Sequence, residues 1–264
     1  MKLRPPVKWH GGKHYLASRI IKLFPDHRIY LEPFGGAASI LLNKKPTNVE
    51  AYNDLDPRIT RLFRVLRDQG QEFVSKLAFT PYSEAEFEAC ADYPAEASDL
   101  DKALCDFVRW RQSFGGQGKT WSCTTTRARG GIAGDVNAWW SAIELLPEII
   151  ARLQCVQILH RTAIEAIEKL DHPEGLIYCD PPYVHSTRSN GSRDVYGYET
   201  TDEDHRQLAE VLRKCKSKIV LSGYASELYG ELYSGWRTVD FDMANHAAGG
   251  GSKRRMIERV WMNF

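Results

Sequence analysis

An Asp-Pro-Pro-Tyr run at residues 180–183 carries the residue types in this chain that are best suited to chemistry. It directly follows an apolar stretch, residues 176–179, which is typical of a buried strand. Ligands of open α/β sheets bind beyond the carboxyl ends of strands. Two prolines remove two backbone donors, so the carbonyls of Asp180 and Pro181 remain as acceptors beside a carboxylate. A planar group bearing an NH2 fits this arrangement, because its hydrogens meet acceptors and its ring stacks on Tyr183.

Taken alone, the run is equally typical of a strand that ends in a rigid Asp-Pro-Pro turn, with Tyr183 packed in the core. A second segment, LEPFGGAAS at residues 31–39, leads from a strand into a glycine turn and a short helix over residues 40–43. Glycines at such a turn let a ligand approach the backbone closely. The glycines do not form the GxGxxG pattern, and Glu32 on its own could be a turn former.

Tyr52-Asn53-Asp54 ends the next predicted strand, about 20 residues after the glycines, where an acidic residue is placed to hydrogen-bond ribose hydroxyls. A helix N-cap before Pro57 is the structural alternative for Asp54.

KWHGGK at residues 8–13 would alone indicate a loop with two exposed lysines.

Short apolar runs alternate with helical patterns along much of the chain. The predicted strands are residues 28–32, 48–52, 175–179, 218–222 and 256–263. Helical faces are expected within residues 16–24 and 208–212. Strands that alternate with helices predict an α/β fold with a doubly wound sheet.

Residues 57–154 interrupt this alternation and predict a mostly helical insertion. One amphipathic helix is expected over residues 100–108 and another over 137–146, with Pro147 near a boundary or kink. Between them lies SFGGQGKT, residues 113–120, which resembles a phosphate-binding P-loop in which Ser113 replaces the first glycine. A P-loop needs a strand before it and a helix after it. The preceding residues are helix-like, so a nucleotide cradle is disfavoured.

The same loop belongs to a basic segment. Residues 107–134 contain five cationic side chains and no acidic one, although the whole chain has a formal net charge of +1. The cationic residues are Arg109, Arg111, Lys119, Arg127 and Arg129. Interleaved glutamines, threonines and Trp121 suit phosphate contacts and the reading of base edges. A solvated loop with scattered charge is the alternative, and we expect DNA contact.

Composition and cysteine spacing indicate the cellular compartment of the protein. The six cysteines form no CxxC pair, which indicates a reduced intracellular protein and no metal site. No apolar run approaches the ~20 residues needed to cross a bilayer, and the N-terminus does not resemble a signal peptide. We expect a soluble cytoplasmic protein of a bacterial or phage-infected cell that binds no membrane.

KWHGGK, EPFGG, NDxD, a helical insertion and CDPPY follow one another in the order of the Dam-type adenine-specific DNA methyltransferases, alpha group, which the chain resembles over nearly its whole length. The resemblance implies a Rossmann-like methyltransferase fold with S-adenosylmethionine as cofactor, S-adenosylhomocysteine as product and no metal. It implies a catalytic domain of residues 1–56 and 156–264 and a helical target-recognition domain of residues 57–155.

The implied activity is transfer of a methyl group to the N6 amine of an adenine flipped out of double-stranded DNA, by a protein that is monomeric in solution and a candidate dimer on DNA. The implied catalytic residues are Asp180, Pro181, Pro182 and Tyr183. The implied cofactor-binding residues are Trp9, Lys13, Glu32, Phe34, Gly35, Gly36, Asp54 and Asp180. The expected DNA-binding residues are Lys8, Arg111, Gln112, Lys119, Trp121, Arg127, Arg129, Arg188 and Tyr196, with a further basic cluster at residues 253–255.

Three points stay open at the level of sequence. The acidic residue that family members carry after the strand preceding the DPPY motif has no clear counterpart, since that neighbourhood reads ILHRT at residues 158–162, with Glu165 further on. Methylation of an RNA amine or of a protein glutamine, and a catalytically idle DNA-binding regulator, are the alternatives. The recognition sequence and the presence of a partner restriction enzyme are not determined.

Overall fold

The computed structural model describes residues 3–9, 11–183, 200–244 and 255–264. The chain divides into two compact units, each built from separate stretches of sequence. The first unit contains Met1–Ser18, Gly36–Lys44 and Pro57–Ile158, and the second contains Arg19–Gly35, Lys45–Asp56 and Leu159–Phe264. The predicted division into a catalytic and a target-recognition domain stays a prediction.

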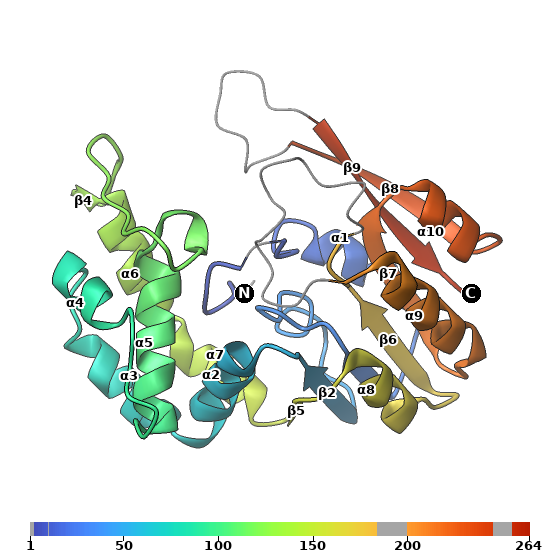
Figure 1. The fold of residues 1–264 in the computed structure, drawn as a ribbon, viewed down its shortest axis with the longest axis horizontal. Helices are drawn as coiled ribbons and strands as arrows, with labels where there is room; N and C mark the ends of the chain where they lie inside the picture. Colours follow the sequence, from blue (N-terminus) through green and yellow to red (C-terminus); the bar gives the residue numbers. More distant parts are fainter. Residues whose placement is uncertain (1–2, 10, 184–199, 245–254) are drawn as a thin grey trace. The chain divides into compact units, whose positions relative to one another are not determined.

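A seven-stranded sheet of order β5-β2-β1-β6-β7-β9-β8 organises the second unit, although β5 begins within the sequence of the first unit (Figure 1). Its strands are β1 (Ile29–Glu32), β2 (Val49–Asn53), β5 (Gln157–Leu159), β6 (Gly175–Cys179), β7 (Lys218–Tyr224), β8 (Arg237–Ala244) and β9 (Arg255–Met262). β1 pairs in parallel with β2 and β6, and β6 with β7. β9 runs antiparallel between β7 and β8. This mainly parallel α/β sheet confirms the predicted Rossmann-like fold class.

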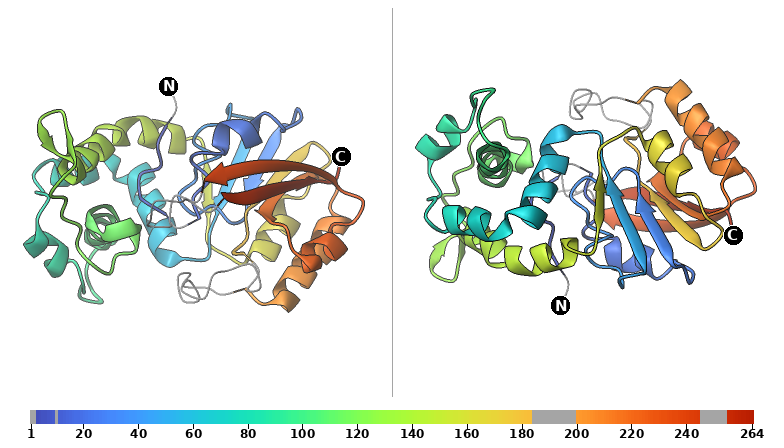
Figure 2. Two further views of the ribbon diagram at one scale, coloured as in Figure 1. Left: turned by 90° about the horizontal axis from the view of Figure 1, so that it is seen from above. Right: turned by 90° about the horizontal axis from the view of Figure 1, so that it is seen from below.

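Three helices cover one face of this sheet: α8 (Ala163–Leu170), α9 (Asp202–Lys214) and α10 (Glu227–Leu232) (Figure 2). Their apolar side chains pack with alternate residues of the central strands, including Ile177, Cys179 and Leu221. Cys179 is fully buried there, in the packing role that its place on an apolar strand predicts. Alternate residues point to the opposite face, where Phe24 packs on Tyr178.

Helices form most of the first unit. They are α2 (Pro57–Asp68), α3 (Gly70–Ala78), α4 (Glu84–Ala89), α5 (Asp99–Gln112), α6 (Gly134–Glu144) and α7 (Leu146–Leu153), with a 3-10 turn η1 (Phe114–Gly116). α5 matches the helix predicted over 100–108. Pro147 lies in the first turn of α7, where its missing N–H costs no helical hydrogen bond, so the predicted boundary is confirmed.

Several local predictions were incomplete or wrong. Residues 40–43 form successive turns rather than a helix, because Ala38 has a positive φ of 56° and the Asn43 side chain caps the carbonyls of Leu3 and Ser39. The helical face of residues 16–24 becomes the short α1 (Ala17–Ile21). β5, β8 and a small hairpin of β3 (Ala128–Arg129) and β4 (Ile132–Ala133) were not anticipated.

Candidate functional site

Three acidic side chains mark one edge of the sheet in the second unit. β1, β2 and β6 are parallel and paired in register, so their carboxyl ends meet at the same edge. Glu32 ends β1, Asp54 follows β2 and Asp180 follows β6. This is the edge at which open α/β sheets bind ligands. The structure therefore brings together the three carboxylates that the sequence singled out in this unit.

Asp180 is held by a hydroxyl from the neighbouring strand β7. Ser222 Oγ donates a hydrogen bond to Asp180 Oδ1 at 2.9 Å, and the Tyr178 hydroxyl lies 2.8 Å from Ser222 Oγ. Tyr178 and Ser222 are both buried, whereas Asp180 is half-buried. A buried hydroxyl network thus supports a carboxylate that is itself partly exposed.

Tyr183 is supported from β7 and β9. Its ring lies 4.3 Å from the ring of Tyr224, with 32° between the two planes. Its hydroxyl donates to the Glu258 carboxylate, at 3.1 Å from Oε2 and 3.3 Å from Oε1. Pro181 is buried, and the Pro182 carbonyl accepts a hydrogen bond from Thr200 Oγ1 at 3.2 Å. The four residues of the motif are therefore held by contacts on more than one strand.

Glu32 is almost wholly buried and paired with a tyrosine of its own strand. The Tyr30 hydroxyl donates to Glu32 Oε1 at 3.0 Å. Complete burial, and then the neighbouring Glu32 carboxylate, raise the pKa of Tyr30 well above its usual value. The phenol therefore stays protonated and acts as a donor that orients the carboxylate. Phe34, two residues on, is half-buried and packs against the apolar core beneath the sheet.

Asn53 joins three chain segments beside Asp54. Its amide nitrogen donates to the carbonyls of Pro33 at 2.9 Å and Arg161 at 3.0 Å, and its amide oxygen accepts from Arg161 N at 3.1 Å. Asp54 follows in a turn in which its Oδ1 accepts from Asp56 N at 2.9 Å. His160 Nδ1 lies 3.1 Å from the Asp54 carbonyl. The fully buried Asn53 thereby fixes the backbone that presents Asp54.

The two glycines of the EPFGG turn are required by aromatic rings. A Cβ on Gly35 would lie 2.1 Å from the ring of the fully buried Tyr52. Gly36 has φ +47°, and a Cβ there would lie 2.6 Å from Trp9 Nε1. Each glycine therefore lets the backbone pass close to an aromatic ring. The close approach of a ligand to this turn stays a prediction.

The first unit carries the other predicted cofactor residues, Trp9 and Lys13. Trp9 packs edge-on against Trp110 of α5, with 5.6 Å between ring centroids, and its carbonyl accepts from Gly12 N at 3.1 Å. Lys13 is buried, and its Nζ donates to the Gly11 carbonyl at 3.2 Å. A buried ammonium costs much less when an anion lies near, which is consistent with a role for Lys13 beside a carboxylate.

Lys8 and Arg111 are two half-buried cations of the first unit, and the Arg111 charge acts on Lys8. Lys8 Nζ donates to the Ser113 carbonyl at 3.3 Å, and Arg111 Nη2 donates to the Ala138 carbonyl at 2.6 Å. Burial and then the Arg111 charge lower the pKa of Lys8, while the Asp135 carboxylate opposes this effect. Burial, and then the charge of Arg4, lower the pKa of Arg111 to about 10. Arg111 remains cationic at neutral pH, and an added phosphate would relieve the repulsion that it exerts on Lys8.

Gln112, a predicted DNA-binding residue, makes its hydrogen bonds within the first unit. Its side chain is 0% exposed, its Oε1 accepts from Ser83 N at 3.0 Å, and its Nε2 donates to the Pro81 carbonyl at 3.0 Å. Both ends of the amide therefore fix the loop before α4. A base edge would have to displace these bonds to reach the amide, and DNA contact by Gln112 stays a prediction.

The SFGGQGKT loop is built as a compact turn. Ser113 forms an isolated antiparallel bridge with Trp121, and Ser113 Oγ accepts from Gly118 N at 2.9 Å. Arg109 stacks on the Phe87 ring at 3.7 Å and donates to the Gly118 carbonyl. Helix α5 precedes the loop and no helix follows it directly in the described residues, so the P-loop remains disfavoured.

The remaining basic residues of this segment face solvent. Lys119, Arg127 and Arg129 are exposed, and the last two belong to the β3–β4 hairpin or its start. Trp121 is half-buried and its ring lies 5.7 Å from that of Tyr82. Sequence reasoning missed Phe114, whose side chain is 74% exposed on the same loop. An exposed ring on a basic segment offers a face on which a nucleic-acid base can stack.

Some predicted residues have other positions or fall outside the described part of the chain. Arg188, Tyr196 and most of the basic cluster at 253–255 lie outside the described residues. Glu165 forms a capping box with Thr162 at the start of α8, so it caps a helix. The residues that sequence reasoning missed in the second unit are Asn53, Tyr178, Ser222, Tyr224 and Glu258; Ser222 is the polar interruption of an apolar strand, which is the signal that points to it.

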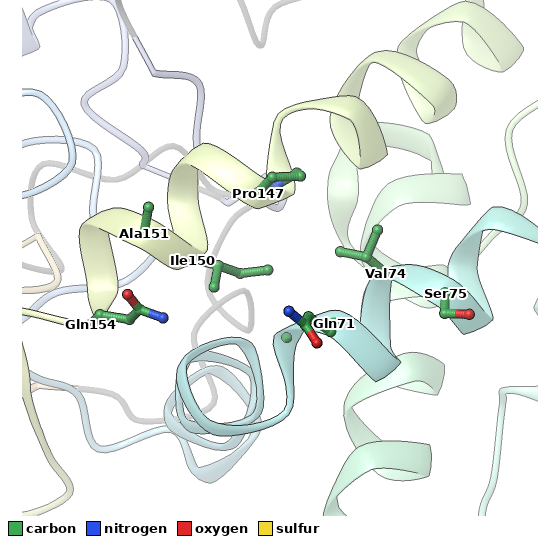
Figure 3. Close-up of a pocket in the computed structure, with 8 residues that line it drawn as sticks. Gln71, Val74, Ser75, Pro147, Ile150, Ala151 and Gln154 are labelled. Atoms are coloured by element: carbon green, nitrogen blue, oxygen red, sulfur yellow. The ribbon is translucent and has the colours of Figure 1, made fainter.

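An apolar groove between α3 and α7 of the first unit is lined by Val74, Pro147 and Ile150, with glutamines at 71 and 154 (Figure 3). Among the described residues no three His, Cys, Asp or Glu side chains gather as metal ligands. No described helix is long and apolar enough to cross a membrane.

A known family model and several known proteins match most of the chain. The model of the D12 class N6 adenine-specific DNA methyltransferases matches residues 9–104 and 130–245. The chain is 23% identical to the Type II methyltransferase M.MjaIII of Methanocaldococcus jannaschii over 100% of both chains. It is 24% identical to a DNA adenine methylase of Vibrio cholerae, over 89% of this chain and 86% of that one.

A solved structure of the rRNA methyltransferase aviRa from Streptomyces viridochromogenes is 14% identical, with a TM-score of 0.35 over 94% of this chain and 83% of that one. The family match, by contrast, spans most of the chain and includes both the EPFGG turn and the DPPY motif. The chain belongs to the D12 class of N6 adenine-specific DNA methyltransferases.

Proposed function

We propose that this adenine-specific DNA methyltransferase uses S-adenosylmethionine to methylate a flipped-out adenine of double-stranded DNA, with Asp180 at the reacting amine. The observation that carries this proposal is the position of Asp180 at the carboxyl end of β6, on the edge that also bears Glu32 and Asp54. S-adenosylmethionine, when bound, supplies a methyl group on a sulfonium, and the product is S-adenosylhomocysteine.

The donor and acceptor groups present fit that cofactor. Ribose hydroxyls and an ammonium are donors, and the edge of the second unit offers the carboxylates of Glu32 and Asp54. A carboxylate needs a cation, and the buried Lys13 ammonium in the first unit is one. We assign Asp54 to the ribose, Lys13 and Trp9 to the methionine end, and Glu32, Phe34, Gly35 and Gly36 to the surrounding pocket.

The chemistry of the acceptor defines what the DPPY motif must do. The lone pair of an adenine amine is delocalised into the ring, so the amine is a poor nucleophile. Asp180 and the Pro181 carbonyl accept its two hydrogens, which favours a more tetrahedral nitrogen whose lone pair is directed at the methyl carbon. When S-adenosylmethionine is bound, its sulfonium would supply the methyl group to this nitrogen, S-adenosylhomocysteine would leave, and one amine proton would pass to solvent. Most of the rate enhancement then comes from positioning and electrostatics.

Tyr183 supplies the platform for the flipped base. Flipping costs a few kcal/mol in lost stacking and pairing, and base–aromatic stacking returns about 1–3 kcal/mol. Tyr224 already packs on this ring, and Glu258 holds its hydroxyl. Both contacts restrict the ring before DNA arrives, so less conformational entropy is lost when the base stacks.

The DNA interface that we propose lies on the first unit. Lys119, Arg127 and Arg129 are exposed and suit phosphates or guanine edges, and Phe114 and Trp121 offer aromatic surface. Lys8 and Arg111 add two half-buried cations. Arg188 and Tyr196 stay predictions from sequence. We expect a cytoplasmic protein that is monomeric in solution.

Substitution Asp180→Ala tests the proposal. Transfer of a tritiated methyl group to duplex DNA is expected to fall below detection, whereas the thermal unfolding midpoint should stay close to the wild-type value because Asp180 is half-buried. The matched control is Asp26→Ala, at an exposed aspartate of the same unit, which should keep full activity. Retained transfer in Asp180→Ala would refute the assigned role. Parallel assays on RNA and on protein distinguish the other acceptors.

A further inference from the structure

A chain of hydroxyl groups leads from the interior of the second unit to Asp180. Ser222 Oγ donates to Asp180 Oδ1 at 2.9 Å. A serine hydroxyl has one hydrogen, and a carboxylate only accepts. Because that hydrogen is directed at Asp180, the Tyr178 hydroxyl, 2.8 Å from Ser222 Oγ, must be the donor in the second contact. The direction of both bonds is therefore defined: Tyr178 to Ser222 to Asp180.

The strands impose this alignment. Tyr178 and Asp180 are two residues apart at the end of β6, and side chains two apart on a strand share a face. β7 lies beside β6 with Tyr178 next to Val220 and Cys179 next to Leu221. Ser222 therefore falls on the same face as Tyr178, at the level of Asp180. No loop movement is needed to form the chain of hydroxyls.

Burial gives the chain its rigidity. Tyr178 is 2% exposed and Ser222 is 0% exposed. Phe24 covers the Tyr178 ring at 6.0 Å between centroids and also contacts Tyr30, at 5.9 Å. Hydrogen bonds in such a low-dielectric site are stronger than in water and polarise one another. The Ser222 bond consequently fixes the rotation of the Asp180 carboxylate about its Cβ–Cγ bond.

We propose that Ser222, supported by Tyr178, is a positioning residue that orients the Asp180 carboxylate toward the adenine amine. This rests on the proposed role of Asp180. An acceptor that is rotated away from the amine hydrogen loses most of the bond, because hydrogen bonds weaken steeply at poor angles. The hydroxyl chain thus acts on the methyl-transfer step rather than on the affinity for DNA or cofactor.

The test compares three variants of the full chain. Ser222→Ala removes the donor to Asp180, and kcat for methyl transfer to duplex DNA is expected to fall by about 10- to 100-fold, the scale of a misplaced reacting group. KM values for DNA and S-adenosylmethionine should change by less than about threefold, because interactions that are equally strong in the ground state and the transition state are unchanged. Tyr178→Phe leaves the Ser222 donor in place, and its kcat should fall less. Ser222→Thr restores a hydroxyl and should recover most of the loss.

Tyr233→Phe is the matched control for Tyr178→Phe. Tyr233 is a buried tyrosine of the same unit whose hydroxyl has no hydrogen-bond partner among the described residues. Its kcat should equal the wild-type value. A Ser222→Ala variant with unchanged kcat would overturn the proposal, as would a Tyr178→Phe variant that loses more than Ser222→Ala. If Ser222→Ala does not fold, Tyr178→Phe must lower kcat relative to Tyr233→Phe, and equality overturns it.

Failure of this proposal is distinguishable from failure of the proposed function. If Asp180→Ala abolishes transfer while Ser222→Ala is fully active, Asp180 acts without the hydroxyl chain and only the positioning role is lost. If Asp180→Ala remains active, the role of Asp180 itself is wrong. Unfolding midpoints of all variants separate a loss of folded protein from a loss of rate.

Discussion

Asn53 offers the sharpest test of how the site is held together. The fully buried amide makes three hydrogen bonds, two to the carbonyls of Pro33 and Arg161 and one from Arg161 N. At about 1 kcal/mol for each bond, with further cost for backbone groups left unsatisfied, Asn53→Ala should destabilise the second unit by about 3–5 kcal/mol. That is a large fraction of the 5–15 kcal/mol typical of folded domains.

The assay is urea unfolding followed by circular dichroism. The free energy of unfolding falls with urea concentration by about 3 kcal/mol/M (the m-value), so a loss of 3–5 kcal/mol lowers the urea midpoint by about 1–1.7 M. The control is Asn48→Ala, at an exposed asparagine just before β2, for which the change should stay within about 0.5 kcal/mol. A midpoint for Asn53→Ala within 0.3 M of wild type, on the order of 1 kcal/mol, would refute the reasoning.

Asn53→Asp adds a dependence on pH whose sign follows from the same contacts. The introduced carboxylate would face the two carbonyls that now accept from the amide nitrogen, so its folded-state pKa should be raised above the usual ~3.9. Stability is then greatest below the unfolded-state pKa and is lost as pH rises through the folded-state pKa. The deficit relative to wild type should therefore grow from about pH 4 upward. A deficit that shrinks as pH rises would contradict this.

Three further predictions concern single side chains. Arg127→Ala and Arg129→Ala should each lower the salt dependence of DNA binding by about one unit of slope, if the lost contact is a phosphate, as measured by fluorescence anisotropy. Gly35→Ala places a Cβ 2.1 Å from a buried tyrosine ring and should cost about 1–3 kcal/mol of unfolding free energy. Glu258→Gln keeps an acceptor for the tyrosine of the DPPY motif and should retain more methyl transfer than Glu258→Ala, as single-turnover rates would report.

Each of these has a control and a contrary outcome. Lys22→Ala, at an exposed lysine of the second unit, should leave DNA affinity unchanged; unchanged affinity and specificity in both arginine variants would remove the hairpin from the interface. Gly230→Ala in α10 meets open space and should stabilise by about 0.5–1 kcal/mol, so equal effects at both glycines would contradict the steric argument. Equal rates for the two Glu258 variants would remove its acceptor role.

The strands that position the site could be predicted where a run of apolar residues indicates a buried strand. Apolar runs with sharp ends located β1, β2, β6, β7 and β9 to within one or two residues. β5 is a short edge strand of three half-exposed or exposed residues, so it has no apolar signature. β8 alternates Val239 and Phe241 with polar residues. This period of two is typical of a strand, but no strand was predicted there.

Side-chain roles within the site were harder to predict, because they depend on partners distant in sequence. The glycines of the EPFGG turn were correctly located, but the rings that require them come from residues 9 and 52. Gln112 has the chemistry of a base reader, and only its burial shows that the amide is engaged. The roles of Ser222 and Glu258 follow only from their hydrogen bonds to Asp180 and Tyr183, which are distant in sequence.

The pairing of β1 with β6 has a consequence for synthesis of the chain. Ile29 is hydrogen-bonded in register with Gly175, and the helical part of the first unit, Pro57–Ile158, is translated between them. On the ribosome, β1 and β2 therefore emerge long before β6, and the side of β1 that pairs with β6 stays unpaired until then. An unpaired strand edge is a site of misassociation. Early folding of the intervening helices, whose contacts are local and fast to form, would shorten the path that β6 must cover to complete the sheet.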